Sequence, residues 1–426
     1  MNSLQRIQPP VFPAEKIIIP EAKSLTLNNG VPVFLIEAGT EDIMRLEFTF
    51  KAGQVNEYLP LLASTTNRML SEGSQNYTSE ELNRILDYHG AFLNMSAEKD
   101  RAGIVLFFLS KHIEKVLELS REILFRPKFP ETELNSLMKK RLRWFQVNRE
   151  KVQNLAIDQF FESVFGKHHP YGHQVTEEDF TMMNPVLLAD FHDKYYTPEN
   201  MAIIVTGKIQ ERTAFLLNEY FGEIRSKNIY IENSENIIKG ERKKKNHIIK
   251  TGTVQSAIRI GSSTINKRHP DYPGLKILDS VLGGYFGSRL MKNIREEKGY
   301  TYGIGSSVNS LDLCGYKLIS TEVGHKNLKQ AIDEIHKEIR LLQTTPVEKE
   351  ELAVIRNFMS GEMLRMFDGP FALAESFRSA WEFGLDNSYF YRLIEKIRTI
   401  EPDEIIELAK TYYNIDDLYQ VTVGAK

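Results

Sequence analysis

The feature that most constrains this chain is an internal repeat. Residues 194–207 read KYYTPENMAIIVTG, and residues 411–424 read TYYNIDDLYQVTVG. Tyr195 corresponds to Tyr412, 217 positions later, and the closing glycines of the two segments keep the same separation. A repeat over this distance, in a chain of 426 residues, predicts two copies of one domain of roughly 210 residues each.

The boundary between the copies follows from the same offset. Pro185 and Pro402 each open an amphipathic helical pattern, where proline is favoured because its missing N–H costs nothing in the first turn. Between the copies, residues 226–246 are polar and charged without a helical period, as in a linker. We therefore expect domains at 1–225 and 247–426.

Each copy shows strand patterns that lead into helices. In the first copy, alternating segments at 25–38 and 44–53 precede helices at about 59–71 and 78–89, and one long helix is expected over 130–165. Strand runs followed by helices predict an α+β protein. We expect two homologous domains, each a mostly antiparallel sheet with helices packed on one face.

Composition excludes several classes of function. The net charge of −3 gives no basic footprint for nucleic acid. The single cysteine, Cys314, rules out an intramolecular disulfide or a thiolate metal cluster and fits a reducing compartment. The first residues lack the apolar core of a signal peptide, and no run of about 18 apolar residues predicts a membrane span. We therefore expect a cytoplasmic protein without a membrane partner.

One segment places two hydrogen-bond donors at a predicted helix–strand corner. Residues 286–307 read FGSRLMKNIREEKGYTYGIGSS, which predicts a helix ending at Lys298 and a strand that carries Tyr300 and Tyr302. Arg295 in the last helical turn and Tyr302 could both donate to one carbonyl oxygen. On spacing alone, an ion pair between Arg295 and a neighbouring glutamate, with a packed tyrosine, is the alternative.

This segment resembles the second-domain signature of the pitrilysin or insulinase family of zinc metallopeptidases. In that family an arginine and a tyrosine seven residues later form a substrate-facing pair, which the resemblance assigns here to Arg295 and Tyr302. Other segments match in the family's order along nearly the whole chain, including LNNGVPVFLIEA, EGSQNYTSEEL, GAFLN, HHPYG and HPDYPGLKILDSVLGGYFGSRL. The family's two-domain design agrees with the repeat.

The zinc motif of active members is replaced. In those members His-x-x-Glu-His lies on one helix, and a glutamate about 76 residues later completes the site. Aligned on the Gly-Ser turn after the helix, these positions hold Ser64, Asn67, Arg68 and Trp144. Arginine offers no lone pair to a metal, and asparagine cannot act as a base. The resemblance therefore implies no zinc in this chain, and we expect the polar block around these residues to face a water-filled chamber.

A second metal site is the alternative. His168, His169 and His173 lie close together in HHPYGH, and clustered histidines can bind a metal. The family carries His-Pro-Tyr-Gly here without using it as a ligand set, so we interpret the segment as a structural turn.

The leading hypothesis from the resemblance is the non-catalytic subunit of a heterodimeric bacterial zinc metalloendopeptidase, inactive alone. A related partner would carry His-x-x-Glu-His and the zinc, while Arg295 and Tyr302 would bind the scissile carbonyl. The substrate would be an unfolded peptide, held partly by strand addition to a sheet edge. The alternatives are a non-proteolytic homodimeric or complex-bound scaffold for peptides or proteins, and an active homodimer with a zinc site that the sequence does not show.

Overall fold

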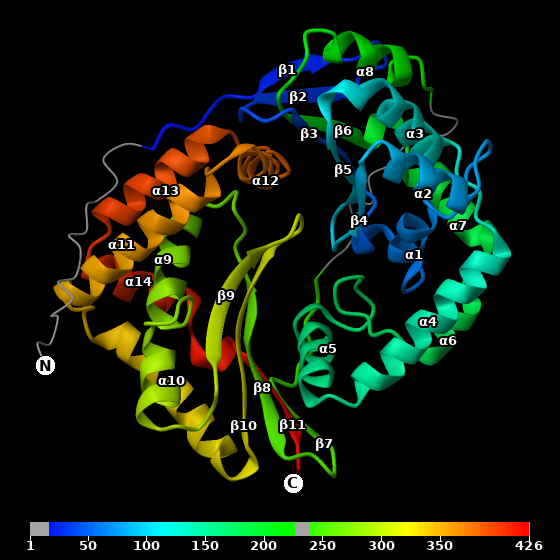
Figure 1. Cartoon of the computed structure of the whole chain (residues 1–426). Helices are drawn as coiled ribbons and strands as arrows, with labels where there is room; N and C mark the ends of the chain where they lie inside the picture. Colours follow the sequence, from blue (N-terminus) through cyan, green and yellow to red (C-terminus); the bar gives the residue numbers. More distant parts are fainter. Residues whose placement is uncertain (1–16, 226–237, 426) are drawn as a thin grey trace, which may run out of the picture.

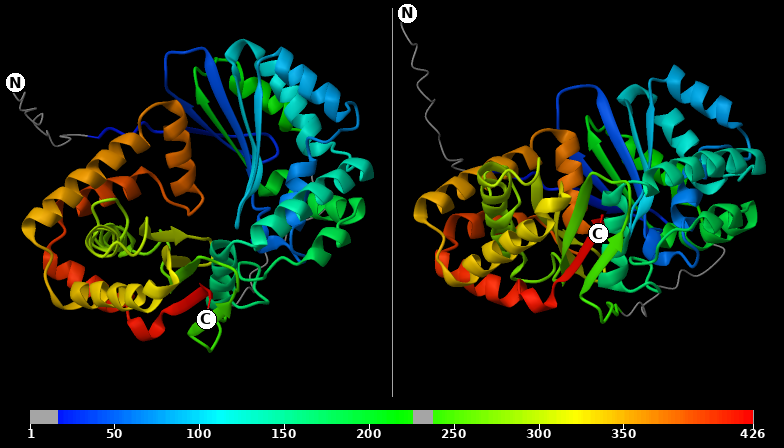
Figure 2. Two further views of the ribbon diagram at one scale, coloured as in Figure 1. Left: turned by 60° about the horizontal axis from the view of Figure 1, so that its bottom comes forward. Right: turned by 90° about the horizontal axis from the view of Figure 1, so that it is seen from below.

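The chain forms two lobes, each built on one sheet (Figures 1 and 2). The computed structural model describes residues 17–225 and 238–425, so residues 226–237 of the predicted linker lie outside the described residues. None of the helices in these ranges is both long enough and apolar enough to cross a membrane.

The first lobe contains six strands and the helices that follow them. Its sheet has the order β1-β2-β6-β3-β5-β4, and every neighbouring pair is antiparallel except β2 with β6. The strands are β1 (Lys23–Thr26), β2 (Pro32–Glu37), β3 (Ile43–Phe50), β4 (Phe92–Ala97), β5 (Ala102–Leu109) and β6 (Met201–Gly207). The helices are α1 (Leu62–Met69), α2 (Ser79–Tyr88), α3 (Ile113–Phe125), α4 (Glu131–Arg149), α5 (Val152–Phe165), α6 (Glu177–Met182), α7 (Pro185–Tyr195) and α8 (Thr213–Phe221).

The second lobe repeats this plan with five strands in the order β7-β11-β8-β10-β9. Only β7 and β11 pair in parallel. The strands are β7 (Lys245–Ile249), β8 (Gln255–Thr264), β9 (Ile304–Ser310), β10 (Gly315–Gly324) and β11 (Tyr419–Gly424). The helices are α9 (Tyr272–Leu282), a π-helix at Met291–Glu297, α10 (Leu328–Thr344), α11 (Lys349–Met366), α12 (Pro370–Trp381), α13 (Asn387–Thr399) and α14 (Pro402–Tyr412). Short 3-10 turns lie at Gln54–Asn56, Ser110–His112, Pro198–Asn200, His325–Asn327 and Ile415–Asp417.

This architecture confirms the predicted α+β fold with two mostly antiparallel sheets. Local signals explain several helix starts. Thr78 and Glu81 form a reciprocal capping box at α2, and Asn184 caps α7 directly before its first-turn proline. The predicted linker overlaps the second sheet slightly, because β7 begins at Lys245.

The predicted single helix over 130–165 is two helices. The chain turns at Lys151, whose backbone is extended (φ −84°, ψ 125°), and α5 then leaves the direction of α4. The turn lets α5 pack on β8 and β11 of the other lobe, where Ala156 and Phe160 join a fully buried cluster with Val421.

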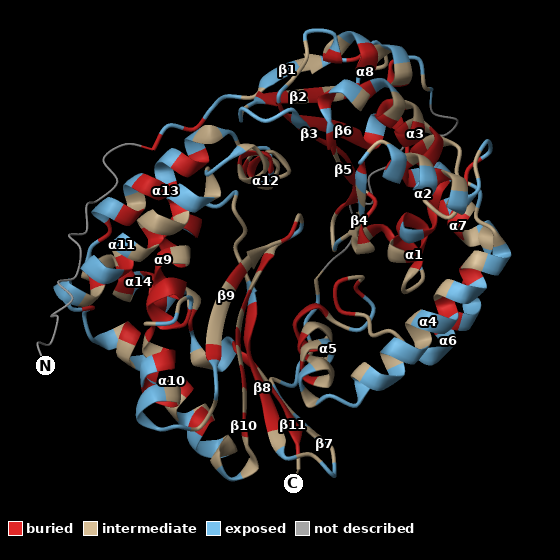
Figure 3. Cartoon of the chain, viewed as in Figure 1, coloured by how far each residue is buried: buried red, intermediate tan, exposed pale blue. Residues whose placement is uncertain are grey.

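A reciprocal contact joins the second lobe to the first. Helix α12, which the repeat offset of 217 relates to α5, packs on β6 and β2. Leu373 and Ala374 bury Ile36 and Ile204 there, on the face of the first sheet opposite the main core of that lobe. Each lobe thus covers its own sheet on one face and donates one helix to the partner lobe's sheet (Figures 1 and 3).

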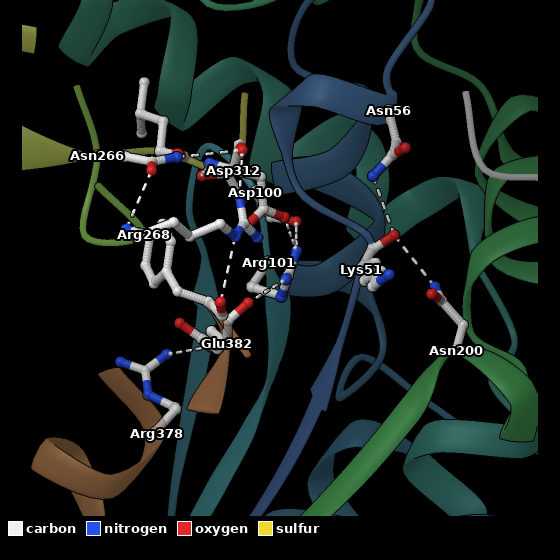
Figure 4. Close-up of polar contacts among 12 residues, drawn as sticks. Lys51, Asn56, Asp100, Arg101, Asn200, Asn266, Arg268, Asp312, Arg378 and Glu382 are labelled. Carbon is white, nitrogen blue, oxygen red and sulfur yellow. Dashed lines mark hydrogen bonds and ion pairs between the residues drawn. The ribbon is translucent and has the colours of Figure 1, made fainter. Parts of the chain in front are cut away.

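The two hairpin turns that follow β4 and β9 also meet at a polar contact between the lobes (Figure 4). The Asp312 N–H donates to the Asp100 carboxylate over 3.0 Å, and Arg101 pairs with the Asp312 carboxylate. Burial, followed by the charge of Asp312, raises the pKa of Asp100 to about 6. Burial also raises the pKa of the nearby Glu382 to about 7.

Candidate functional site

Helix α1 begins with unusual backbone geometry. Leu61, directly before it, has a φ of 72°, the only positive φ of a non-glycine residue in the ranges that the structure describes. The buried Glu57 carboxylate accepts the Ala63 N–H over 3.0 Å and so satisfies one of the free donors at the helix start. This positions the polar face of α1 against α4.

Two hydroxyls of α1 bind an arginine of α4. The Arg141 guanidinium donates to Thr65 Oγ1 over 2.8 Å and to Ser64 Oγ over 2.9 Å. Burial lowers the pKa of Arg141 from its ordinary value, and the charge of Arg68 acts in the same direction. No carboxylate of the described residues lies within ion-pair distance of Arg141.

Asn67 points the other way, into the interior of the lobe. Its side chain is 2% exposed, and its Nδ2 donates to the Gly103 carbonyl over 3.0 Å and to the Tyr196 hydroxyl over 3.2 Å. Arg68 is exposed. The expectation that this whole block faces water is therefore wrong: Thr65 and Asn67 are buried and find partners within the protein.

Trp144 lies on α4 one helical turn after Arg141, and its side chain is 69% exposed. The side chain opposite Ser64 is therefore that of Arg141, which the sequence interpretation did not single out. The motif spacing of about 76 residues, counted from Arg68, leads to Trp144 and not to Arg141, so the motif carries no signal for Arg141.

A cavity of about 660 Å³ opens beside this group, between α4, α5 and the turn after β4. Its lining combines cations with aromatic rings, and Leu61 and Arg141 connect it to α1. Lys99 reaches into the same cavity, with its Nζ 4.2 Å from the centre of the Phe161 ring. Burial lowers the pKa of Lys99 to about 8. The volume is typical of pockets that hold small organic ligands or a few peptide residues.

The histidine segment serves structure. The His169 ring accepts the Tyr171 N–H over 3.0 Å, and His173 Nε2 lies 3.0 Å from the Glu57 carboxylate. Among residues 17–225 and 238–425, no group of three or more His, Cys, Asp or Glu side chains is arranged to hold a metal. The side chains at the expected motif positions also do not fit a zinc ion, since Asn67 faces inward and the cation Arg141 occupies the hydroxyl face of α1.

The second predicted pair lies at an exposed corner of the other lobe. Arg295 Nε donates to the Tyr302 carbonyl over 3.0 Å, its guanidinium lies 4.7 Å from the centre of the Phe286 ring, and it forms an ion pair with Glu296 over 3.8 Å. The Tyr302 side chain is 92% exposed, and within the described residues its hydroxyl has no hydrogen-bond partner. Of the alternative, the ion pair with a neighbouring glutamate is therefore present, and the packed tyrosine is wrong.

The local backbone differs from the prediction. Neither Tyr300 nor Tyr302 lies in a strand, because β9 begins at Ile304, and the preceding turn is π-helical rather than α-helical. π-Helical turns are rare and occur frequently at functional sites. Tyr302 therefore stands on a loop whose shape Arg295 holds through the backbone carbonyl.

Two family models match most of the chain. The model described as insulinase, peptidase family M16, matches residues 33–176, and the model described as the peptidase M16 inactive domain matches residues 184–359.

Individual relatives are distant but match over long stretches. A Bacillus subtilis (strain 168) protein described as the uncharacterized zinc protease YmxG is 24% identical over 80% of this chain and 83% of its own length. The probable inactive metalloprotease YmfF of the same strain is 22% identical over 71% of this chain and 73% of its own. Among solved structures, the peptidase M16 inactive domain from Pseudomonas fluorescens superimposes with a TM-score of 0.85 at 21% identity, covering 95% of this chain and 98% of that one.

Proposed function

The chain belongs to the insulinase family, peptidase family M16, as one of its inactive members, and from this premise we propose that it is the non-catalytic subunit of a two-chain zinc metalloendopeptidase. Its partner would be a related chain that keeps His-x-x-Glu-His. This chain would bind unfolded peptide and supply Arg295 and Tyr302 to the partner's active site. The metal positions of this chain do not fit zinc, so no chemical step is assigned to them.

One observation carries the proposal: the Tyr302 phenol is almost fully exposed on a loop held by Arg295. A tyrosine ring left in water does not contribute the stabilisation of about 2 kcal/mol that its burial in the protein would give. Such a ring is poised to contact a group outside this chain. Its hydroxyl could donate to a substrate carbonyl as negative charge develops on the oxygen, which is the role of an oxyanion hole.

Arg295 would act in two ways. Its Nε fixes the Tyr302 backbone, and the remaining guanidinium donors stay available beside the Phe286 ring. A guanidinium keeps its charge at any pH at which a peptidase works, so it can attract the same substrate oxygen.

Peptide binding has a second support in the sheets. Strands β4 and β9 each form one edge of their sheet, so no strand of the described residues pairs with their outer N–H and C=O groups. An extended peptide can pair with such an edge. A scaffold that binds peptides without hydrolysing them would use the same strand edges. A scaffold is therefore the second candidate function, supported by the relative described as a probable inactive metalloprotease.

The test reconstitutes the pair. The purified chain is assayed alone and together with the His-x-x-Glu-His relative from the same genome, on an unstructured fluorogenic peptide. We expect cleavage only in the mixture. Tyr302→Phe should lower kcat about 100-fold, as expected for an oxyanion donor, and should leave the melting temperature unchanged.

Tyr88→Phe is the matched control, since Tyr88 is also exposed, at 84%, but lies in the other lobe. Stoichiometric zinc and cleavage by the chain alone would contradict the non-catalytic role. Full activity of the Tyr302→Phe mixture would exclude the role given to this phenol and would favour the scaffold.

A further inference from the structure

The cavity beside α1 carries more positive charge than its own carboxylates balance. Its lining includes Lys99, Lys140, Arg141 and Arg149, against one acidic side chain, Asp158. Among the described residues, none of these four cations lies within ion-pair distance of a carboxylate.

The two deepest cations are held by neutral groups. Arg141 is bound by the hydroxyls of Ser64 and Thr65, while Lys99 donates to the Tyr171 carbonyl over 3.3 Å. Both side chains are half-buried, and burial is the largest influence on the pKa of each, lowering it against the opposing charge of Glu57.

The buried carboxylate whose charge acts on both cations, Glu57, is already engaged. Glu57 uses one oxygen for the Ala63 N–H at the start of α1 and the other for His173. Burying a cation without a paired anion costs free energy. The structure tolerates two such cations in one cavity, which favours an anion brought by a ligand.

The rest of the lining is apolar and aromatic. Trp144, Phe145, Phe161 and Phe180 form this part, and Trp144 is 69% exposed. A ring of this size exposed at a cavity wall offers a large surface for stacking. The cavity therefore suits a ligand that joins an anionic group to an apolar side chain.

We propose that this cavity binds the free C-terminal carboxylate of an unfolded peptide whose last side chain is aromatic or aliphatic. Arg141 and Lys99 would contact the carboxylate, and Trp144 and Phe145 would contact the side chain. The anion site follows from the charges of the cavity alone, while a peptide as its ligand rests on the proposed function. The face of α1 that carries zinc ligands in active relatives would thus hold, through Arg141, a peptide terminus in this chain.

The experiment compares two peptides on the full chain without a partner. A nine-residue unstructured peptide ending in Leu-Phe is labelled with fluorescein at its N-terminus, and its free acid and C-terminal amide are titrated by fluorescence anisotropy. We expect the acid to bind at least about 10-fold more tightly, because a charge-assisted bond to arginine is lost in the amide. Equal affinities would overturn the proposal without any substitution.

Variants locate the contact. Arg141→Gln keeps an amide donor for Ser64 and Thr65 but removes the charge, and it should abolish the preference for the acid. Arg143→Gln is the matched control, because Arg143 is exposed on the same helix and does not line the cavity. If Arg143→Gln weakens the acid as much as Arg141→Gln does, the effect is general electrostatics and the proposed site is wrong.

The chain contains its own reporter. Of its two tryptophans, Trp381 packs against Phe34 where α12 lies on the first sheet, so Trp381→Phe leaves Trp144 as the sole tryptophan. Saturation with the acid should shift its emission, and an unchanged spectrum would contradict contact at Trp144.

Lys99→Gln gives a second loss of charge should Arg141→Gln fold poorly. A failed reconstitution with the partner would leave these results intact, so the two proposals fail separately.

Discussion

Helices α1 and α9 occupy the same place in the two lobes, yet they differ in what their polar residues contact. Asn67 lies three residues before Leu70 at the end of α1, and Asp279 lies three residues before Leu282 at the end of α9, so we compare these two residues; both are buried. Asn67 donates to the Tyr196 hydroxyl, and Tyr413, the counterpart of Tyr196, lies near Asp279. A buried polar group on this helix, beside this tyrosine, is therefore common to both lobes.

The difference lies one turn earlier. Ser64 and Thr65 bind Arg141, whereas Lys276 and Ile277, at the corresponding places in α9, have no side-chain hydrogen bond to an arginine within the described residues. The polar residues of α1 therefore fall into two groups, according to what they contact. Asn67 stabilises the fold through buried hydrogen bonds, and the hydroxyls of Ser64 and Thr65 hold Arg141 at the cavity.

The largest expected effect on stability is at Asn67, because a buried polar residue at this place is common to both helices. Asn67→Leu removes two hydrogen bonds and leaves the buried Tyr196 hydroxyl without the partner that Asn67 provides, so it should lower the free energy of unfolding by about 3 kcal/mol. Urea denaturation followed by fluorescence measures this. Arg68→Gln, at the exposed neighbouring position, should change it by less than about 0.5 kcal/mol. Similar values for both would mean that Asn67 has no special role.

The second test replaces Asp279 of α9 by asparagine, the residue that α1 has at the corresponding place. Burial raises the pKa of Asp279, so the folded protein binds a proton that the unfolded chain has released. Stability from this group is complete below the unfolded pKa of about 4 and is lost as the pH rises through the folded value. Asp279→Asn should therefore be more stable than the natural protein at pH 8, because the asparagine is neutral at that pH in both the folded and the unfolded state.

That gain should disappear below about pH 4, where both side chains are neutral. Urea denaturation at pH 8 and pH 4 gives the two values, with the exposed Asp333→Asn as control. A gain that persists at the lower pH would show that packing, rather than charge, separates the two helices.

The smallest effect is expected at the cavity. Ser64 is half-buried, and Arg141 keeps its bond to Thr65 when the Ser64 hydroxyl is removed, so Ser64→Ala should cost about 0.5 kcal/mol. Denaturation under the conditions used for Asn67→Leu allows a direct comparison. A cost as large as that of Asn67→Leu would place Ser64 among the residues that the fold requires and would remove the distinction drawn within α1.

Sequence reasoning reached the fold because the repeat and the family resemblance both persist over the whole chain. It missed the break at Lys151, because the helical period continues across it. Ala156 and Phe160 have the same pattern whether they face their own lobe or the other one, and only the tertiary packing on β8 and β11 decides.

The candidate site was predictable only in part. The roles assigned to Arg295 and Tyr302, and the alignment of Ser64, Asn67, Arg68 and Trp144 with the zinc motif, remain predictions. The burial of Asn67 could not be predicted, because a polar residue on this face is expected to contact water unless its hydrogen-bond partners within the protein are known. The contact of Arg141 with Ser64 and Thr65 could not be predicted either, because it depends on how α4 lies against α1 in the folded lobe.

The exchange of α5 and α12 makes the two lobes depend on each other. Either copy by itself would leave one face of its sheet uncovered where the helix of the other copy now lies. The second copy in the chain is therefore part of what each sheet needs to bury its apolar residues.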